Sequence, residues 1–289
     1  MTGTRPLILA GMLLAACLLL PVLTVLMIPD RVIERFVVRS LASRGVTLQA
    51  ERLGTAVPLG LKGSGLAIGD GNATYLTIDR ASVRLRLLPL LTGTVAASLE
   101  GRIGAGTIGG SVTLYPSPGG NLQVSGLQLA ELPVLTRTIE GSITGTLQLD
   151  AEFKGASGEA KLRISSLGLS KAKLAAMPLP DLTVPDTRGL LKLSGSTVSI
   201  ASLAMQGEGI YLRLTGSLPL APSAPLALNL ELLPTAELLE RQKSVFLLMF
   251  PYLTSPGRYT LPIGGTLASP QLTPRGATTT PPPPAPPAP

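Results

Sequence analysis

Hydrophobic and polar residues alternate along the whole of the stretch IEGSITGTLQLDAEF, residues 139–153. Its odd positions carry Ile, Gly, Leu, Ala and Phe, whereas its even positions carry Glu, Ser, Thr, Gln and Asp. Because successive strand residues point to opposite faces of a sheet, this stretch predicts a β-strand with one apolar and one polar face.

The same two-residue period returns along the chain from Val46 onward. It is visible in the segments 122–129, 161–164, 191–194, 198–200, 212–215 and 228–232. In the first of these, a Ser-Gly slip separates Leu122 and Val124 from Leu127 and Leu129 and changes the phase of the alternation. Stretches rich in Gly and Pro separate the segments. We therefore predict about ten to thirteen strands, mostly in an antiparallel meander.

Only one sizeable helix is predicted after residue 45, in the stretch TAELLERQKSVFLLM at residues 235–249. Thr235 is suited to cap it, and the spacing of its apolar residues follows a helical period. The residues expected to face inward are Leu238, Leu239, Val245, Phe246 and Met249. One helix cannot cover the apolar face of a dozen strands. The sheet must therefore fold on itself as a sandwich or barrel, or remain curved and open with an apolar trough.

The resulting fold class is mainly β: an elongated, curved antiparallel sheet, either a half-pipe or a partly closed barrel. The apolar positions of residues 139–153 are the candidate lining of its groove, namely Ile139, Ile143, Leu147, Leu149 and Phe153. Inward-packed and lipid-facing side chains have the same chemistry. The pattern alone therefore leaves open whether the sheet binds a guest or merely fills its own core.

The N-terminal segment from Leu7 to Ile28 carries no charge over 22 residues, enough for a helix to cross a hydrocarbon core of about 30 Å. A cleaved signal peptide is the main alternative, but its apolar region would be shorter. Residues 14–17, Leu-Ala-Ala-Cys, also resemble a lipobox, which would make Cys17 an acylated residue. We expect an uncleaved transmembrane anchor over residues 1–29. Basic residues after the span would keep the body in the cytoplasm, yet long domains often ignore that count, and we expect a periplasmic body.

A short amphipathic helix is predicted over residues 30–45, directly after the anchor. Arg31, Arg35 and Arg39 recur every four residues on one side of an apolar stripe. These arginines are candidate membrane-surface contacts, with their guanidinium groups on lipid phosphates. The alternative is an ordinary helix that caps the body and exposes a solvated basic face. The body itself is assigned to residues 46–274, and the Pro-rich segment 275–289 to a disordered tail.

Composition argues against catalysis. The chain has no His, and its only Cys lies in the apolar N-terminal segment, which excludes Ser-His-Asp and Cys-His pairs, His or Cys zinc sites and disulfides. The 17 acidic residues form no close cluster. We therefore expect no enzyme activity, cofactor, metal or catalytic residue. Gly104, Gly106 and Gly109 match GxGxxG, but the segment that follows has the pattern of a strand rather than the helix that a nucleotide site needs.

The formal charge of +7 gives no reason to expect nucleic acid as a partner, because the basic residues are scattered and no aromatic residues lie between them. Attraction to an anionic membrane surface is the simpler interpretation.

The order of these segments resembles a known family. An N-terminal span and a short helix lead into RGVTLQAERLGTAVPLGLKGSGLAI and VRLRLLPLLTGTVAASLEGRIGAGTIGGSV, which is similar to AsmA-like proteins. The later segments LPDLTVPDTRGLLKLSGSTVSIASLAMQGEGIYLRLTGSLPL and IGGTLASPQL resemble the type II secretion system protein N (GspN) family. The resemblance spans about residues 5 to 273 and rests on order and spacing rather than on any one motif.

This resemblance implies a non-enzymatic protein of the bacterial inner membrane, with a single span and most of the chain in the periplasm. Its implied role is accessory or assembly component of a type II protein secretion system, with secretin or inner-membrane platform proteins as partners. The AsmA-like part implies an alternative, a lipid-binding or phospholipid-transfer envelope protein that uses the apolar face of its curved sheet. A third alternative is a structural envelope protein whose sheet closes on itself.

Overall fold

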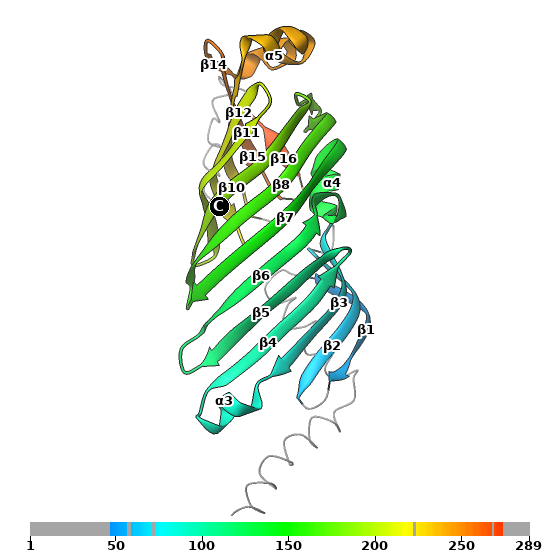
Figure 1. Ribbon diagram of the computed structural model, residues 1–289, viewed down its shortest axis with the longest axis vertical. Helices are drawn as coiled ribbons and strands as arrows, with labels where there is room; N and C mark the ends of the chain where they lie inside the picture. The colour runs from blue at the N-terminus through cyan, green and yellow to red at the C-terminus, as the bar shows by residue number, and fades with distance from the viewer. Residues whose placement is uncertain (1–46, 57–58, 71–72, 222–223, 268, 274–289) are drawn as a thin grey trace, which may run out of the picture.

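A computed structural model describes residues 47–56, 59–70, 73–221, 224–267 and 269–273. Within these ranges the protein is mainly β, with one antiparallel sheet of 16 strands that does not close into a barrel (Figure 1). The predicted anchor, the predicted helix at 30–45 with Arg31, Arg35 and Arg39, and the Pro-rich tail lie outside the described residues. Within the described part of the chain, no helix has both the length and the apolar character needed to cross a bilayer.

The strands follow one another across the sheet as a meander, in the order β1 to β8, β10 to β13, β15 and β14. β9 pairs with β8 and β16 pairs with β15 beside this path. The strands are β1 (Thr47–Ala56), β2 (Gly60–Gly69), β3 (Thr74–Leu85), β4 (Val95–Ile103), β5 (Gly106–Tyr115), β6 (Gly119–Gln128), β7 (Ile139–Lys154), β8 (Ser157–Leu174), β9 (Met177–Pro178), β10 (Leu182–Ser194), β11 (Thr197–Gly207), β12 (Ile210–Pro219), β13 (Ala227–Pro234), β14 (Leu253–Ser255), β15 (Arg258–Gly265) and β16 (Pro270–Leu272).

The meander was predicted, but the predicted number of strands was too small. β9, β14 and β16 contain only two or three residues each. Two or three residues carry no readable alternation, and such strands form because a neighbouring strand offers free backbone groups.

The Ser-Gly slip predicted in the segment 122–129 is a β-bulge on β6. Val124 lies opposite Leu149 of β7, and the next inward residue, Leu127, lies opposite Leu147. Ser125 and Gly126 therefore occupy the place of one residue, and Gly126 takes a φ of 70°, in the left-handed region that glycine tolerates best. The bulge keeps the apolar residues of β6 on one face despite the change of phase.

Four short α-helices lie among the described residues: α3 (Leu87–Leu91), α4 (Pro133–Thr138), α5 (Ala236–Arg241) and α6 (Lys243–Leu248). Two 3₁₀ turns accompany them, η1 (Leu129–Glu131) and η2 (Phe250–Tyr252). The helix predicted over 235–249 is thus present, but it is divided in two at Gln242.

Local sequence and a distant contact together shape this helical pair. Thr235 caps α5 as predicted, since its hydroxyl accepts a hydrogen bond from the backbone N–H of Leu238 at 3.4 Å. At the break, the Gln242 side chain bonds the backbone of Asp181 twice: its Oε1 accepts from the Asp181 N–H and its Nε2 donates to the Asp181 carbonyl, each at 2.9 Å. The helical pair is therefore fixed to the loop before β10.

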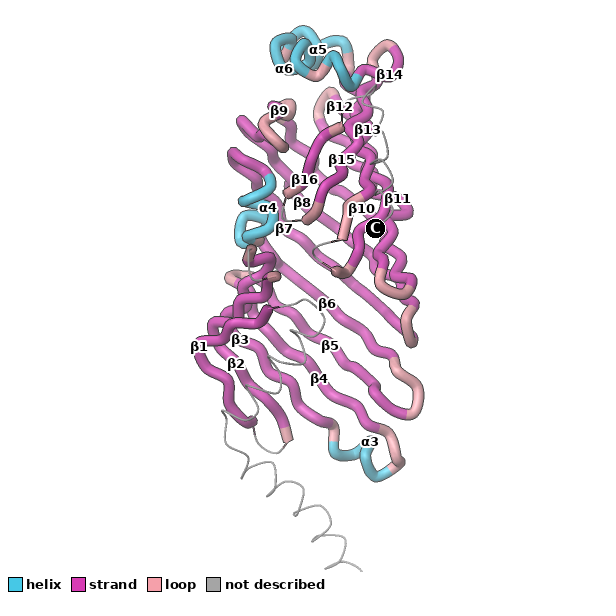
Figure 2. Tube along the Cα trace, turned by 180° about the vertical axis from the view of Figure 1, so that it is seen from behind, coloured by secondary structure: helices cyan, strands magenta, loops and turns pink. Residues whose placement is uncertain are grey.

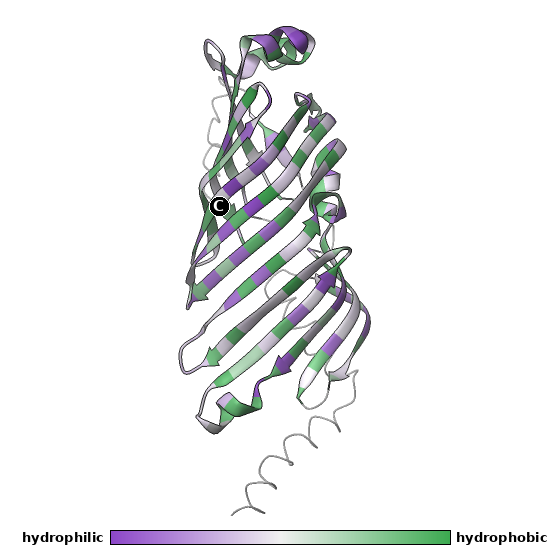
Figure 3. Cartoon of the chain, viewed as in Figure 1, coloured by the Kyte–Doolittle hydropathy of each residue, from purple (hydrophilic) through white to green (hydrophobic). Residues whose placement is uncertain are grey.

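The sheet is elongated and curved. Seen from behind, β1 to β3 and the last strands curl toward the viewer on either side of the middle strands (Figure 2). Hydrophobic and hydrophilic residues form alternating bands along the middle strands (Figure 3), as expected for a sheet with one apolar and one polar face. The segment after the GxGxxG match is strand, as predicted: Gly104 lies in the turn after β4, and Gly106 and Gly109 belong to β5.

Candidate functional site: the apolar face of the sheet

β7 lies in the middle of the meander and presents its predicted apolar face to one side. The even-numbered residues Thr144, Gln148, Asp150 and Glu152 are exposed, whereas the odd-numbered residues between and beside them are buried or half-buried. The alternation is thereby confirmed for residues 147–153. Before them Gly141 is exposed and Thr146 half-buried, because the pairing with β8 shifts register at two places, so the predicted alternation is not unbroken.

The apolar face of β7 continues across the sheet because the neighbouring strands pair with it in register. Leu149 lies opposite Val124 of β6 and Leu162 of β8. Following the pairings outward gives a row over nine strands: Ile108, Val124, Leu149, Leu162, Gly189, Leu203, Leu214, Leu230 and Leu261. At about 4.8 Å between strands, the row is about 38 Å long.

The two ends of this face differ in how well they are covered. Near β10 to β15, Val184, Leu232 and Leu261 belong to a large buried cluster that also takes in Leu238 of α5 and Phe246 of α6. Near β4 to β6, only Ile103, Val124 and Leu127 form a buried cluster. The C-terminal end of the apolar face thus shares a large buried cluster with the helical pair, although Leu214 and Leu230 of the row stay half-buried there. The other end has only the smaller cluster and is more thinly covered.

Partly exposed apolar side chains surround the smaller cluster. Ile108, Leu147 and Leu149 pack against it while remaining half-buried, and Val83 on β3 is exposed. Leu147 also packs against the large cluster, so it stands at the junction between the two. The thinly covered part of the apolar face is called the trough below, and its residues are Val83, Ile108, Leu122, Leu147, Leu149 and Phe153.

All five predicted groove positions lie on β7, but they do not share one environment. Ile143 is buried in the large cluster, and Ile139 packs against it. Leu147 and Leu149 lie at the smaller cluster, and Phe153 is half-buried near the far end of β7. A side chain at Gly120 would meet the Phe153 ring within 2.8 Å, so the glycine makes room for the ring. Leu147, Leu149 and Phe153 are thus the members of the predicted set that reach the trough.

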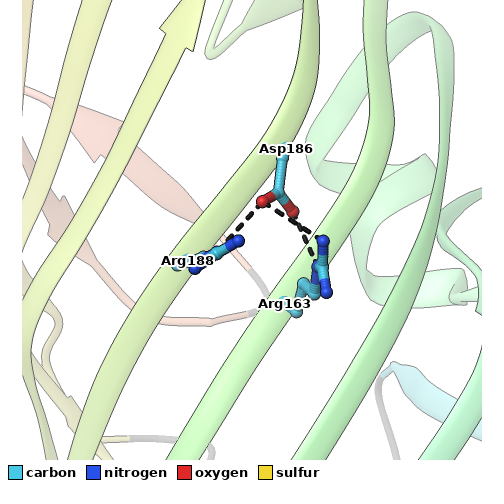
Figure 4. A network of polar contacts seen from close by, with 3 residues as sticks. All are labelled: Arg163, Asp186 and Arg188. Atoms are coloured by element: carbon cyan, nitrogen blue, oxygen red, sulfur yellow. Dashed lines mark hydrogen bonds and ion pairs between the residues drawn. The ribbon is translucent and has the colours of Figure 1, made fainter.

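The opposite face of the sheet is polar and solvated. Asp186 on β10 accepts hydrogen bonds from the Nε atoms of Arg163 at 2.8 Å and Arg188 at 3.0 Å (Figure 4). The bond from Arg163 is the main cause that holds the pKa of the Asp186 carboxyl below its ordinary value. The resulting stabilisation is present above the unfolded pKa, about 4, and is lost as the pH falls through the folded pKa. Because the pair is solvent-exposed, it adds little to stability.

A second feature of the polar face escaped the sequence analysis. Arg52, Arg80 and Arg102 come from β1, β3 and β4 and line one depression together with Glu51 and Glu100. Arg80 and Arg102 lie directly opposite each other in the sheet. Only the strand register brings these residues together, because they are spread over 51 positions of the chain. No group of three or more His, Cys, Asp or Glu residues suited to a metal occurs in the part of the chain that the structure describes.

One polar atom lies inside the apolar face. The hydroxyl of Thr187 on β10 is fully buried between Ile164 of β8 and Met205 of β11 and has no hydrogen-bond partner. A buried hydroxyl without a partner keeps its full desolvation cost, about 1–3 kcal/mol.

Replacing Thr187 by Val is therefore expected to raise the free energy of unfolding by about 1 kcal/mol, because valine has the same shape and no polar atom. Chemical denaturation of the full chain in detergent, followed by circular dichroism, measures it. Thr183→Val is the matched control, since Thr183 is exposed on the same strand and its change should stay within about 0.5 kcal/mol. A loss of stability in Thr187→Val would mean that its hydroxyl has a partner.

Comparison of the chain with models of protein families, with curated proteins and with solved structures found no match. The fold and its apolar face place the protein in a structural class, that of open antiparallel β-sheet proteins with one apolar face.

Proposed function

We propose that the protein is a lipid-binding envelope protein of AsmA-like type, in which the trough holds the acyl chains of phospholipid. One observation carries the proposal: an apolar row of nine strands lies on a sheet that does not close, and part of that row is only half-buried. A protein that merely filled its own core would be expected to bury this part of the row more fully.

The dimensions suit this role. A bilayer's hydrocarbon core of about 30 Å holds two acyl chains end to end, so one chain needs about 15 Å. The apolar row of about 38 Å exceeds that length, even after its C-terminal end is set aside. Each methylene group transferred from water contributes about 0.8 kcal/mol, so many small contacts with Leu, Ile and Val would hold a chain without any polar anchor.

A photoreactive residue in the trough tests the proposal. Benzoylphenylalanine at Leu149 in the full chain should form phospholipid adducts on illumination of membranes, detected by mass spectrometry. The same residue at Gln148, the adjacent exposed position on the polar face, is the matched control and should give at least tenfold fewer adducts. Equal yields at both positions, or adducts only with protein at Leu149, would overturn the proposal.

An accessory role in type II secretion is the second candidate. The longer segment that resembles the GspN family, residues 179–220, contains three consecutive strands, β10 to β12, so it belongs to one continuous unit of the sheet. In this role the anchor would hold the chain in the inner membrane and the body would meet secretin or platform proteins in the periplasm. Affinity purification of the full chain from gently solubilised membranes should then recover those proteins. Recovery of neither would count against it.

A further inference from the structure

Three large apolar side chains are exposed together at one extreme of the molecule. Leu247 and Leu248 at the end of α6 are 71% and 58% exposed, and Phe250 at the start of η2 is 65% exposed. Figures 1 and 2 place this helical pair beyond the last strands, at one tip of the long axis. These three residues are called the tip patch.

The exposure of the tip patch is built into a rigid support. Phe246, Met249 and Tyr252, which alternate with the exposed residues, are buried in the large cluster. The ring of Phe246 also packs on that of Tyr259 of β15, with centroids 5.3 Å apart. Together with the two bonds between Gln242 and Asp181, these contacts fix the elements that carry the patch. The tip patch is thus held outward by the packing of its neighbours.

The size of the patch decides between two kinds of partner. Even a large aromatic side chain buries at most about 250 Å², so three side chains about two-thirds exposed offer at most about 500 Å². A stable protein interface needs about 800 Å² on each partner. The tip patch is too small to hold a protein by itself, but inserting a few apolar side chains is how a surface helix binds at the boundary between headgroups and acyl chains.

The charges around the patch fit the same partner. Lys243 is exposed on α6 one turn before Leu247, where its stem can lie along the patch while its ammonium group reaches phosphate. Arg241 is exposed at the end of α5, and the exposed acidic residues Glu237 and Glu240 lie farther from the patch along the chain. A cation beside inserted Leu and Phe is the arrangement expected at a lipid surface.

We propose that the tip patch, Leu247, Leu248 and Phe250, inserts into the surface of a phospholipid bilayer. This contact would bring the C-terminal end of the sheet to a lipid surface. It does not depend on lipid in the trough, because the patch and the trough lie on different elements.

The absence of Trp from the chain makes a direct test available, since Phe250→Trp would introduce a single tryptophan whose emission can be excited apart from that of the five Tyr. The full chain, reconstituted in vesicles, is mixed with separate vesicles of phosphatidylethanolamine and phosphatidylglycerol whose acyl chains carry bromine. The Phe250→Trp emission should shift to shorter wavelength and be quenched by at least half. In the same background, Leu247→Ser with Leu248→Ser should lower the apparent vesicle affinity at least tenfold.

Tyr115→Trp is the matched control, because Tyr115 is 62% exposed at the end of β5, far from the tip patch along the chain and an odd number of residues from Ile108 of the trough. Its emission should not respond to the brominated vesicles. Unchanged circular dichroism would show that each variant retains its fold. Equal quenching in both Trp variants would overturn the proposal. Quenching of the Phe250→Trp variant only after a membrane protein is added would also overturn it, because the patch would then bind a protein rather than lipid.

Discussion

Replacing Leu261 by Ala is expected to lower the free energy of unfolding by about 3–5 kcal/mol. Leu261 on β15 is fully buried at the end of the apolar row, in the same cluster as Val184 and Leu232. Truncation to Ala removes the transfer free energy of three carbon atoms and leaves a cavity that the paired strands cannot close without breaking their register.

The same substitution at Leu149 tests whether the two ends of the apolar row are packed equally well. Leu149 stands in the same row but is only half-buried in the trough, so Leu149→Ala should cost about 1 kcal/mol. Both variants are compared with the parent chain by chemical denaturation in detergent, followed by circular dichroism. Equal losses would show that the apolar face is packed alike at both ends, and the trough would not be an open site.

A carboxylate in the trough is expected to reduce lipid binding at least tenfold while the fold is retained. In Leu149→Glu, the half-buried position lets the new carboxylate reach water, so the sheet should still form. An acyl chain seated on the same position would have to strip that water away, and an ionised carboxylate without a partner is costly to desolvate. The substitution should therefore weaken the binding of an acyl chain far more than it lowers the stability of the protein.

The readout is the yield of phospholipid adducts from benzoylphenylalanine at Phe153, which lies on the same face of β7. Gln148→Glu is the matched control, because it adds the same charge at the adjacent position on the polar face and should leave the yield unchanged. Loss of the fold in Leu149→Glu would indicate a packed core. A retained fold with an unchanged yield would place the lipid elsewhere.

Features carried by short stretches of sequence were predictable. The alternation of β7, the slip on β6 and the cap at Thr235 each depend on a few neighbouring residues. The break between α5 and α6 was missed because it involves Asp181 and Gln242, which are 61 positions apart. The alternation of β3 also breaks, since Asp79 and Arg80 are both exposed, and a two-residue period cannot anticipate such a step.

The candidate site was predictable in its chemistry but not in its extent. Leu149 and Leu261 occupy equivalent positions in the alternation of their strands and lie in one row, yet one is half-buried and the other fully buried. Leu261 shares its buried cluster with Leu238 of α5 and Phe246 of α6, whereas Leu149 packs only against the smaller cluster. The tip patch could have been predicted only from a weaker pattern. Phe246 and Met249 were expected to face inward on the helix, which leaves Leu247 and Leu248 between them as apolar residues without an inward position.

The meander has a consequence for how the molecule is made. Almost every strand pairs with the strand that precedes it in the chain, so the sheet can grow hairpin by hairpin as the polypeptide emerges, without waiting for a distant segment. The same connectivity would let a hairpin be added or removed without rearranging its neighbours, so the length of the sheet can change one hairpin at a time.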